Sequence, residues 1–187
     1  MVKTHSSPAA IGWSMPDFRL PDFDGRNHDS AEMVGANGVL VTFICNHCPY
    51  VKHIGEGLAR MAKDLRFSGV STIGINSNDA TRHPEDDAEG MREAAAMYGY
   101  QFPYLVDADQ DIARAFGAVC TPDFYLFDRE HRLFYRGQMD DSRPRNGLVV
   151  TGEHLRDAVS KMLVGEPAPS NQVPSLGCSI KWRENDS

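Results

Sequence analysis

The sequence predicts an α/β fold with a central mixed β-sheet flanked by helices, in which the first strands are parallel and the last two antiparallel. Three observations lead to this class. Residues 39–44 form a run that is apolar on both faces, as expected for a central strand. An amphipathic helical pattern follows directly, and strand and helix patterns then alternate along the chain. Near the end, two strand patterns are joined by a polar turn at residues 128–131, as in a hairpin.

Before the central strand, the sequence predicts a loose start and a small hairpin. We expect residues 1–11 to be a flexible N-terminus. Residues 13–20 form an extended segment of apolar and polar residues, and Asp24-Gly25 then gives a turn signal. The domain is therefore expected to begin with an N-terminal β-hairpin extension.

The pattern after Pro49 predicts a long helix. Apolar residues recur every three or four positions and so share one helical face, until Gly69 ends the helix. The residues of this face are Val51, Ile54, Leu58, Met61 and Leu65.

The later elements follow in a regular order. They are a strand at 70–75, a helix at 85–98 with Met91, Ala95 and Tyr98 on its inner side, a strand at 102–106, a short helix at 109–116 ended by Gly117, strands at 124–127 and 133–135, and a last helix that Thr151 caps and Gly165 ends. Residues 166–174 are rich in proline and polar residues. We therefore expect one domain at 12–165, followed by an extended C-terminal tail at 166–187.

Composition excludes several classes of function. The chain has 187 residues, of which 41% are hydrophobic and 24% charged, as in an ordinary soluble protein. A net charge of −7 without a basic cluster argues against nucleic acid and anionic membranes as partners. No apolar run approaches the ~20 residues that span a bilayer. The first ten residues lack the apolar core of a secretory signal, so we expect a cytoplasmic protein.

Two of the four cysteines form the most informative motif, Cys45-Asn46-His47-Cys48. It lies where the central strand meets the long helix. The first turn of a helix offers unpaired N–H groups and the positive end of the dipole, which favour a thiolate over a thiol. Cys120 and Cys178 stand alone in the sequence, which argues against a paired zinc site. The motif therefore predicts a reactive dithiol.

This dithiol, followed by Thr121-Pro122 ahead of the last hairpin and helix, resembles the thioredoxin fold. The segment from Gly12 to Phe18 resembles the N-terminal signature of the redoxin (AhpC/TSA) and peroxiredoxin branch. Together with residues 45–51, 120–123, 140–142 and 177–182, it resembles a peroxiredoxin-like subgroup that carries a thioredoxin-type dithiol. The similarity extends from about Gly12 to Trp182 and implies a thioredoxin-like fold and thiol–disulfide chemistry.

The resemblance also implies roles for the motif residues. Cys45 is expected to be the exposed nucleophile that faces the helix N–H groups, and Cys48 to be the enclosed, resolving thiol. We expect Asn46 and His47 to tune the redox centre. An imidazole beside the thiols lowers the pKa of the Cys45 thiol and raises the reduction potential above about −270 mV, the value of thioredoxin. The alternative is that His47 is an exposed loop residue without a partner.

Pro122 matches the cis-proline position of thioredoxin-like proteins. Its expected role is to shape the substrate face and to leave the backbone of Thr121 free to pair with an extended peptide substrate. Cys120 precedes it by two residues and is either a further redox thiol or, as we favour, a small buried hydrophobe.

Cys178 lies in the predicted tail, just before Ile180 and Trp182. Two interpretations stay open at this stage. Cys178 is either a distal resolving thiol or part of a segment that Ile180 and Trp182 anchor to the domain.

Two departures from the family patterns bear on activity. If the peroxidatic cysteine of peroxiredoxins is aligned with Cys48, Cys45 occupies the position of the conserved threonine and Val41 that of the proline, which argues against efficient peroxidase activity. Val39 stands where thioredoxin has its buried acid, so proton transfer to Cys48 needs another group or water.

Metal binding is the main alternative from another class. Cys45, Cys48, His47 and His53 are ligand types that suit zinc or copper. His53 lies about 140° around the helix from Cys48, which disfavours a tetrahedral site. We therefore predict no metal and no cofactor.

Polar residues outside the motif carry weaker signals. We interpret Asp140-Asp141 as a solvated loop, paired with Arg143 or Arg145, rather than as an acid–base site. Asn76 and Asn78 follow the second core strand and are expected to cap the loop near the dithiol.

The sequence thus predicts a cytoplasmic thiol–disulfide oxidoreductase that uses Cys45 and Cys48. Its expected partners are protein or small-molecule disulfides, with peroxides as further candidates, and a thiol reductant that recycles the dithiol. A homodimer is left open. The alternatives are a peroxiredoxin-like thiol peroxidase with an antioxidant role, and a metal-binding or redox-sensing module.

Overall fold

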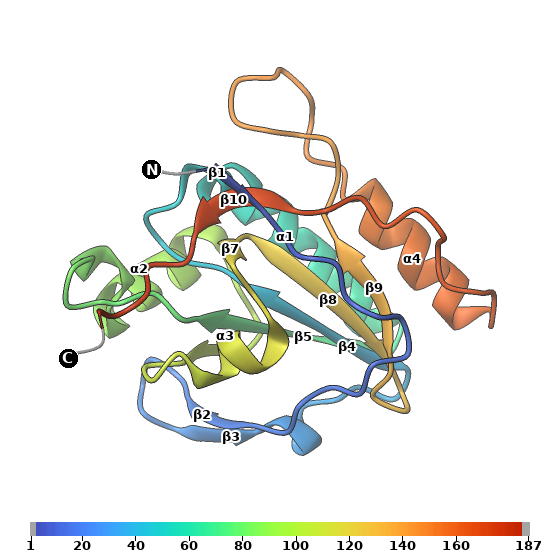
Figure 1. The fold of residues 1–187 in the computed structure, drawn as a ribbon, viewed down its shortest axis with the longest axis horizontal. Coiled ribbons are helices and arrows are strands. Elements are labelled where there is room, and N and C mark those ends of the chain that lie inside the picture. Colours follow the sequence, from blue (N-terminus) through green and yellow to red (C-terminus); the bar gives the residue numbers. More distant parts are fainter. Residues whose placement is uncertain (1–2, 185–187) are drawn as a thin grey trace.

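The computed structural model describes residues 3–184, and its centre is a mixed sheet in which a three-stranded and a two-stranded part lie side by side (Figure 1). In spatial order the strands are β6 (Tyr104–Val106), β5 (Val70–Asn76), β4 (Gly38–Phe43), β8 (Asp123–Asp128) and β9 (Leu133–Gly137). β5 pairs with β6 in parallel, whereas β8 is antiparallel to both β4 and β9. The N–H of Ile44 donates to the carbonyl oxygen of Ile75 at 3.0 Å, so the C-terminal ends of β4 and β5 lie together. This edge of the sheet receives the dithiol motif.

Helices cover both faces of this sheet. They are α1 (Pro49–Phe67), α2 (Ala88–Tyr98), α3 (Asp111–Phe116) and α4 (Glu153–Leu163). Along β4, Leu40 packs with α1, α2 and α4, whereas Val39 and Val41 pack with α3 on the opposite face. This alternation is the two-residue period of a strand buried on both sides. None of the described helices combines the length and apolar character that a membrane span requires.

The predicted N-terminal hairpin is confirmed. β2 (Arg19–Pro21) pairs with β3 (Asn27–Asp29), and a single-turn 3₁₀ helix (Ser30–Glu32) follows. The hairpin lies below the main sheet, on the side of α3 (Figure 1).

A second, smaller sheet joins the two ends of the described chain. β10 (Leu176–Ser179) lies between β1 (Lys3–His5) and β7 (Cys120–Thr121) and is antiparallel to both. The sequence predicted a flexible start and an extended tail, so this pairing is a difference. β1 and β10 have three and four residues, which is too few for a recognisable period-two pattern. The tail is nevertheless packed against the domain, because Cys178 and Ile180 are buried.

Two helix starts also differ from the prediction. The segment predicted as helix 85–98 divides into a 3₁₀ turn (Pro84–Asp86) and α2, because the Asp87 side chain accepts the N–H of Gly90 and caps a new helix. α4 begins after Gly152 rather than after Thr151. Gly152 has φ +69, a backbone conformation that L side chains rarely adopt, so this entry to the helix favours glycine.

Candidate active site

Both cysteines of the motif are buried at the junction of β4 and α1. Cys45 is 1% and Cys48 0% exposed, and both are free thiols. The expectation that Cys45 is the exposed thiol is therefore wrong. A substrate reaches either sulfur only after neighbouring chain moves aside.

The start of α1 decides which sulfur receives the helix N–H groups. Pro49 is the first helical residue, and its fixed φ suits this position. Cys48 is consequently the N-cap, and the backbone N–H of Val51 is among the groups that lower the pKa of its thiol. The sequence predicted this environment for Cys45, but the structure gives it to Cys48, because the helix begins after the motif.

The thiol pKa values follow from this geometry. The pKa of Cys48 is well below that of an ordinary thiol because its thiolate accepts hydrogen bonds from Cys178, from Cys45 and from backbone N–H groups of Val51 and Cys178. The pKa of Cys45 is raised by burial first, then by its hydrogen bond to Cys48 and by the charge of Asp86. The negative charge of the dithiol therefore resides on Cys48.

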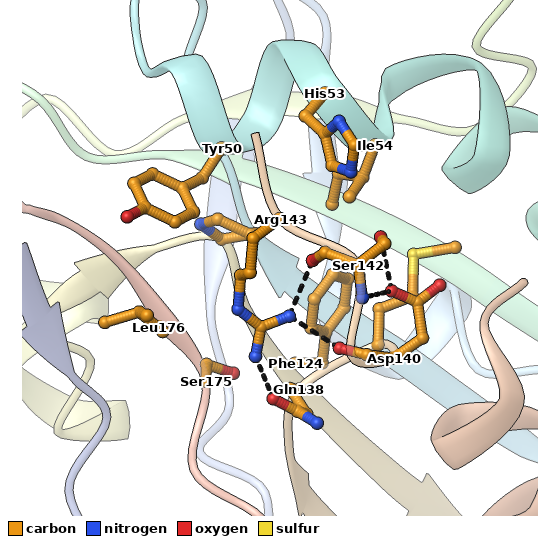
Figure 2. Close-up of a pocket in the computed structure, with 12 residues that line it drawn as sticks. Tyr50, His53, Ile54, Phe124, Gln138, Asp140, Ser142, Arg143, Ser175 and Leu176 are labelled. Carbon is orange, nitrogen blue, oxygen red and sulfur yellow. Dashed lines mark hydrogen bonds between the residues drawn. The ribbon is translucent and has the colours of Figure 1, made fainter. Parts of the chain in front are cut away.

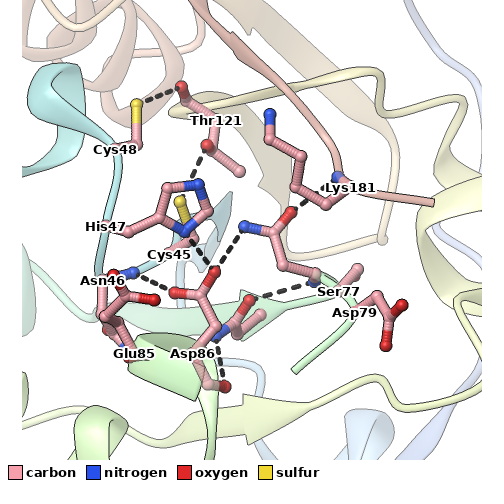
Figure 3. Close-up of polar contacts among 12 residues, drawn as sticks. Cys45, Asn46, His47, Cys48, Ser77, Asp79, Glu85, Asp86, Thr121 and Lys181 are labelled. Atoms are coloured by element: carbon pink, nitrogen blue, oxygen red, sulfur yellow. Dashed lines mark hydrogen bonds and ion pairs between the residues drawn. The ribbon is translucent and has the colours of Figure 1, made fainter. Parts of the chain in front are cut away.

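The Thr121–Pro122 peptide bond is cis, as predicted. Thr121 lies beside both sulfurs of the dithiol (Figure 3). The Thr121 hydroxyl lies 3.1 Å from the Cys45 sulfur. The Thr121 carbonyl oxygen lies 3.3 Å from the Cys48 sulfur and accepts its S–H when that thiol is protonated. The backbone of Thr121 is not free for a substrate, however, because Thr121 pairs with Cys178 of β10.

A buried carboxylate, Asp86, organises the motif from below (Figure 3). It accepts hydrogen bonds from the backbone N–H of Asn46 at 2.6 Å and from the side-chain amide of Asn78 at 2.7 Å. The oxygen that accepts the Asn78 amide, Oδ2, also lies 2.6 Å from Nδ1 of His47. Burial opposes the charge, but the hydrogen bonds from His47, Asn46 and Asn78 outweigh it and lower the pKa of Asp86. Asp86 is thus ionised at neutral pH.

His47 has partners, so the alternative of an isolated loop histidine fails. Its side chain is 10% exposed, its Nδ1 pairs with Asp86, and its ring stacks on His83 at 4.6 Å between centroids. Nδ1 is therefore directed to Asp86 rather than to the Cys45 sulfur. Asn46 is held in the same way, by hydrogen bonds to the Glu85 carbonyl oxygen and the Tyr104 hydroxyl, and braces the motif.

Sequence reasoning missed Asp86. The available signal was that loops after parallel strands meet at one edge of a sheet, which places the acidic loop after β5 beside the motif. Four acidic residues lie in that loop (Asp79, Glu85, Asp86 and Asp87), and no pattern shows which one turns inward. The prediction for the asparagines is confirmed, because the side chains of Asn76 and Asn78 both hold the 3₁₀ turn that carries Asp86.

The two other cysteines have different surroundings. Cys120 is fully buried in β7, and burial first, then the charge of Asp123, raises the pKa of its thiol. This agrees with the favoured interpretation of a small buried hydrophobe. Cys178 lies in β10 and forms a hydrogen bond with Cys48, and that bond is the main cause that raises the pKa of the Cys178 thiol. Of the two cysteines outside the motif, Cys178 is the one that contacts the Cys48 sulfur.

The alternative ligand set of Cys45, Cys48, His47 and His53 does not come together in the structure. Among the described residues, the ligand atoms that come within 4.8 Å of one another at the motif belong to Cys45, His47 and Asp86. His47 and Asp86 already pair with each other. His53 instead lines a pocket with Tyr50 and Arg143 and is not part of the group formed by Cys45, His47 and Asp86.

That pocket lies between the first turns of α1 and the loop after β9 (Figure 2). Tyr50, His53 and Ile54 line it from α1, and Arg143 closes it from the loop. Its volume is about 20 Å³, room for roughly one water molecule. In this state the pocket is too small for a peptide or a small organic disulfide.

The acidic pair beside this pocket differs from the prediction of a solvated loop. Asp140 is only 2% exposed, and its carboxylate accepts the backbone N–H groups of Thr151 and Gly152 at 2.8 and 2.6 Å. It thereby satisfies donors at the entry to α4. Arg143 donates to the main-chain oxygen of Asp140 rather than to its carboxylate, and Asp141 is exposed.

These features define a class: a thioredoxin-like domain with a buried dithiol at the start of a helix, opposite a cis-proline. Within that class the chain belongs to the AhpC/TSA family, whose sequence profile matches residues 11–136. Among curated proteins it is similar to thiol-disulfide oxidoreductase ResA from Geobacillus thermodenitrificans (strain NG80-2), with 24% identity over 70% of each chain.

Solved structures match over almost the entire chain. An uncharacterised conserved protein from Geobacillus kaustophilus is 47% identical, with 99% of this chain and 98% of that chain covered and a TM-score of 0.95. A hypothetical protein from Sinorhizobium meliloti 1021 is 48% identical, with coverages of 97% and 100% and a TM-score of 0.94. The thioredoxin domain of a thiol-disulfide oxidoreductase from Bacteroides vulgatus, 17% identical, covers 83% of this chain and 99% of its own with a TM-score of 0.64, which shows the shared fold.

Proposed function

We propose that this protein is a thiol–disulfide oxidoreductase that exchanges disulfides through Cys45 and Cys48. The observation that carries the proposal is the position of Cys48 at the N-cap of α1, where several donors stabilise a thiolate next to a second thiol. The similarity to ResA, which is named a thiol-disulfide oxidoreductase, supports it.

The geometry favours Cys48 as the attacking thiolate and Cys45 as the resolving thiol, the reverse of the order expected from the resemblance. The Cys48 thiolate attacks one sulfur of a substrate disulfide, forms a mixed disulfide with it and releases the other sulfur as a thiolate. Cys45 then loses its proton and attacks the Cys48 sulfur. This step releases the second substrate thiolate and leaves a Cys45–Cys48 disulfide, which a thiol reductant reduces.

The proton of Cys45 needs an acceptor at the resolving step. A ring nitrogen of His47 lies within 4.8 Å of the Cys45 sulfur, and Asp86 fixes the orientation of the ring. His47 is therefore the base that we assign to this step. The absence of thioredoxin's buried acid at Val39 fits an arrangement in which the base comes from the motif itself.

Cysteine variants test both the function and the order of attack. We expect Cys48→Ser to abolish the reduction of an insulin-type disulfide, because it removes the thiolate. Cys45→Ser/Cys178→Ser lacks both thiols that contact Cys48, so it should complete the first step only and accumulate mixed disulfides on Cys48, visible by mass spectrometry. Cys120→Ser, another buried cysteine, serves as the control and should retain turnover. If both motif variants keep wild-type turnover, the proposed function is wrong; if Cys48→Ser accumulates the mixed disulfides instead, only the order is wrong.

A thiol peroxidase is the second candidate, and the observation that favours it is the same N-cap thiolate. In this reaction the Cys48 thiolate would attack a peroxide. Cys45 stands at the position of the conserved threonine of peroxiredoxins, and this substitution argues against efficient peroxidase activity. Rapid peroxide consumption that is lost in Cys48→Ser and retained in Cys45→Ser supports this candidate. An antioxidant role depends on the same result.

We further propose that the protein acts in the cytoplasm, where a reducing thiol pool recycles the dithiol. The net charge of −7 is consistent with a protein that does not bind anionic membranes. Fractionation of cells, with immunodetection of the protein in each fraction, tests the location. Whether two copies associate stays a prediction for size-exclusion chromatography.

A further inference from the structure

The substrate edge of the cis-proline is occupied by the protein's own C-terminal segment. β10 pairs antiparallel with β7, so that Cys178 lies opposite Thr121 and Ser179 opposite Cys120. The N–H of Ile180 extends this pairing with a hydrogen bond of 3.0 Å to the Val119 carbonyl oxygen. An extended peptide bound at the cis-proline would take the same place.

The approach of β10 to Thr121 is unusually close. A Cβ atom at Gly177 would lie 1.9 Å from the carbonyl oxygen of Thr121, so only glycine permits this contact. The next residue, Cys178, is 3% exposed and directs both its thiol and its backbone N–H to the Cys48 sulfur. The strand thus presents a cysteine to the dithiol as a substrate strand would.

Contacts on both sides of Cys178 hold this segment in place. On its outer edge, β1 pairs with β10, with Lys3 opposite Cys178. Beyond it, the N–H of Lys181 donates to the Asn78 side chain at 2.9 Å, and its carbonyl oxygen accepts the side-chain amide of Gln110 at 2.8 Å. Asn78 also binds Asp86, so the tail and the motif share one hydrogen-bond network.

We propose that β10 is an internal substrate strand and that Cys178 is a third redox thiol, which takes the disulfide of Cys48 over from Cys45. The inference rests on the proposed function. The Cys178 thiolate attacks the Cys48 sulfur of the Cys45–Cys48 disulfide. The Cys48–Cys178 bond forms as the Cys45–Cys48 bond breaks, and Cys45 leaves as a thiolate that accepts the proton lost by Cys178. One disulfide and one thiol are present before and after, so no external oxidant or reductant is needed.

The relay assigns a chemical role to Cys178. It converts a disulfide enclosed within the motif into one that ties the tail to the helix N-terminus, and it returns Cys45 to the thiol state. A substrate that pairs with β7 must displace β10, so a Cys48–Cys178 disulfide also holds the substrate edge closed.

Disulfide mapping of full-length variants tests the relay. Cys45→Ser is incubated with oxidised glutathione, quenched in acid and analysed by peptide mass spectrometry. We expect glutathione to add to Cys48 and to be displaced by Cys178, which gives a Cys48–Cys178 disulfide. In Cys45→Ser/Cys178→Ser the glutathione should stay on Cys48 and be lost at least about tenfold more slowly, because the intramolecular thiol is gone.

Cys45→Ser/Cys120→Ser is the matched control, since Cys120 is also buried and lies opposite the neighbour of Cys178 in the same ladder. It should still form the Cys48–Cys178 disulfide. Cys45→Ala gives the same readout if the serine variant does not fold. Glutathione that persists on Cys48 whether or not Cys178 is present overturns the relay alone. If Cys48 carries neither glutathione nor a disulfide bond in any of these variants, the proposed function fails together with the relay.

Discussion

At the scale of single residues, one carboxylate holds the reactive motif in its shape. Asp86 binds the backbone of Asn46 and the ring of His47, and it does so from a loop about forty residues further along the chain. Burial and the hydrogen bond to Cys48 raise the pKa of Cys45, and the charge of Asp86 raises it further. Asp86 therefore positions the motif and adds to the effects that keep the proton on Cys45.

Replacing this carboxylate should affect stability and acidity together. We expect Asp86→Asn to lower the free energy of unfolding by about 2 kcal/mol, because donors of Asn46, His47 and Asn78 lose an acceptor inside the protein. Removal of the charge should also lower the pKa of Cys45. Urea unfolding measures the first effect, and thiolate absorbance in a Cys48→Ser background measures the second. Glu85→Gln is the exposed control and should change neither; equal effects of both substitutions would contradict the role of Asp86.

A second prediction concerns the charge on Cys48. Because its pKa is lowered, the Cys48 thiolate should persist as the pH falls well below 8, whereas an ordinary thiol with a pKa near 8.5 is protonated there. We expect the thiolate absorbance of the reduced protein at neutral pH to survive down to about pH 5. The absorbance should disappear in Cys48→Ser and remain in Cys120→Ser. A titration with a midpoint near that of a free thiol would rule out the assignment.

The residues show where sequence reasoning stops. The dithiol, the cis-proline and the helix after Pro49 all carry local signals, and their prediction was confirmed as to position. The sequence did not predict the roles of Cys45 and Cys48 correctly. These roles depend on the residue at which α1 begins, and a shift of less than one helical turn exchanges them. Asp86 and Cys178 reach the motif only through tertiary contacts, and one sequence contains no record of such contacts.

At the scale of elements, the site is made by two chain segments of opposite character. α1 is long and amphipathic, so its periodicity identifies it without the structure. β10 has four residues and no distinctive pattern, yet it completes the site because it pairs with the strand that precedes the cis-proline. Gly177 is the residue that makes this pairing close.

Gly177→Ala should therefore loosen β10 from β7. The new methyl group would collide with the Thr121 carbonyl oxygen, and we expect a loss of about 1–3 kcal/mol in stability. The thiols of Cys48 and Cys178 should then react faster with a small aromatic disulfide under native conditions. Gly35→Ala is the matched control, because its Cβ would lie 2.4 Å from the Gly69 carbonyl oxygen and Gly35 precedes β4, at the end of this strand opposite to the motif. It should reduce stability without accelerating the thiols; similar acceleration in both variants would mean that global unfolding, not β10, exposes them.

At the scale of the whole molecule, the order of strands and helices was predictable because each long element carries its own period. The central mixed sheet, the crossover through α1 and the last hairpin all agree with the prediction. The small sheet that joins β1, β10 and β7 was not predictable, since it pairs residues near opposite ends of the chain. The fold thus pairs β1 with β10 near the ends of the described chain and places Cys178 of β10 against Cys48, so the surroundings of the dithiol depend on segments far apart in the sequence.

This coupling predicts that reduction stabilises the protein. In the reduced state the Cys48 thiolate accepts hydrogen bonds from Cys178, Cys45 and the start of α1, and oxidation to a disulfide removes the charge that these donors stabilise. A dithiol whose reduced form is stabilised is the stronger oxidant, so we expect a reduction potential above about −270 mV. Each unit by which folding lowers the pKa of Cys48 contributes about 1.4 kcal/mol to the reduced protein. The sign follows from linkage: this stability is fully present above the unfolded pKa near 8.5 and decreases as the pH falls toward the lower folded pKa.

Urea unfolding of both redox states at pH 9 and pH 6, with a glutathione redox titration, measures these quantities. Cys178→Ala removes one donor and should lower both the potential and the advantage of the reduced state, whereas Cys120→Ala should lower neither; an oxidised protein that is the more stable one at pH 9 would show that the thiolate does not control the redox balance.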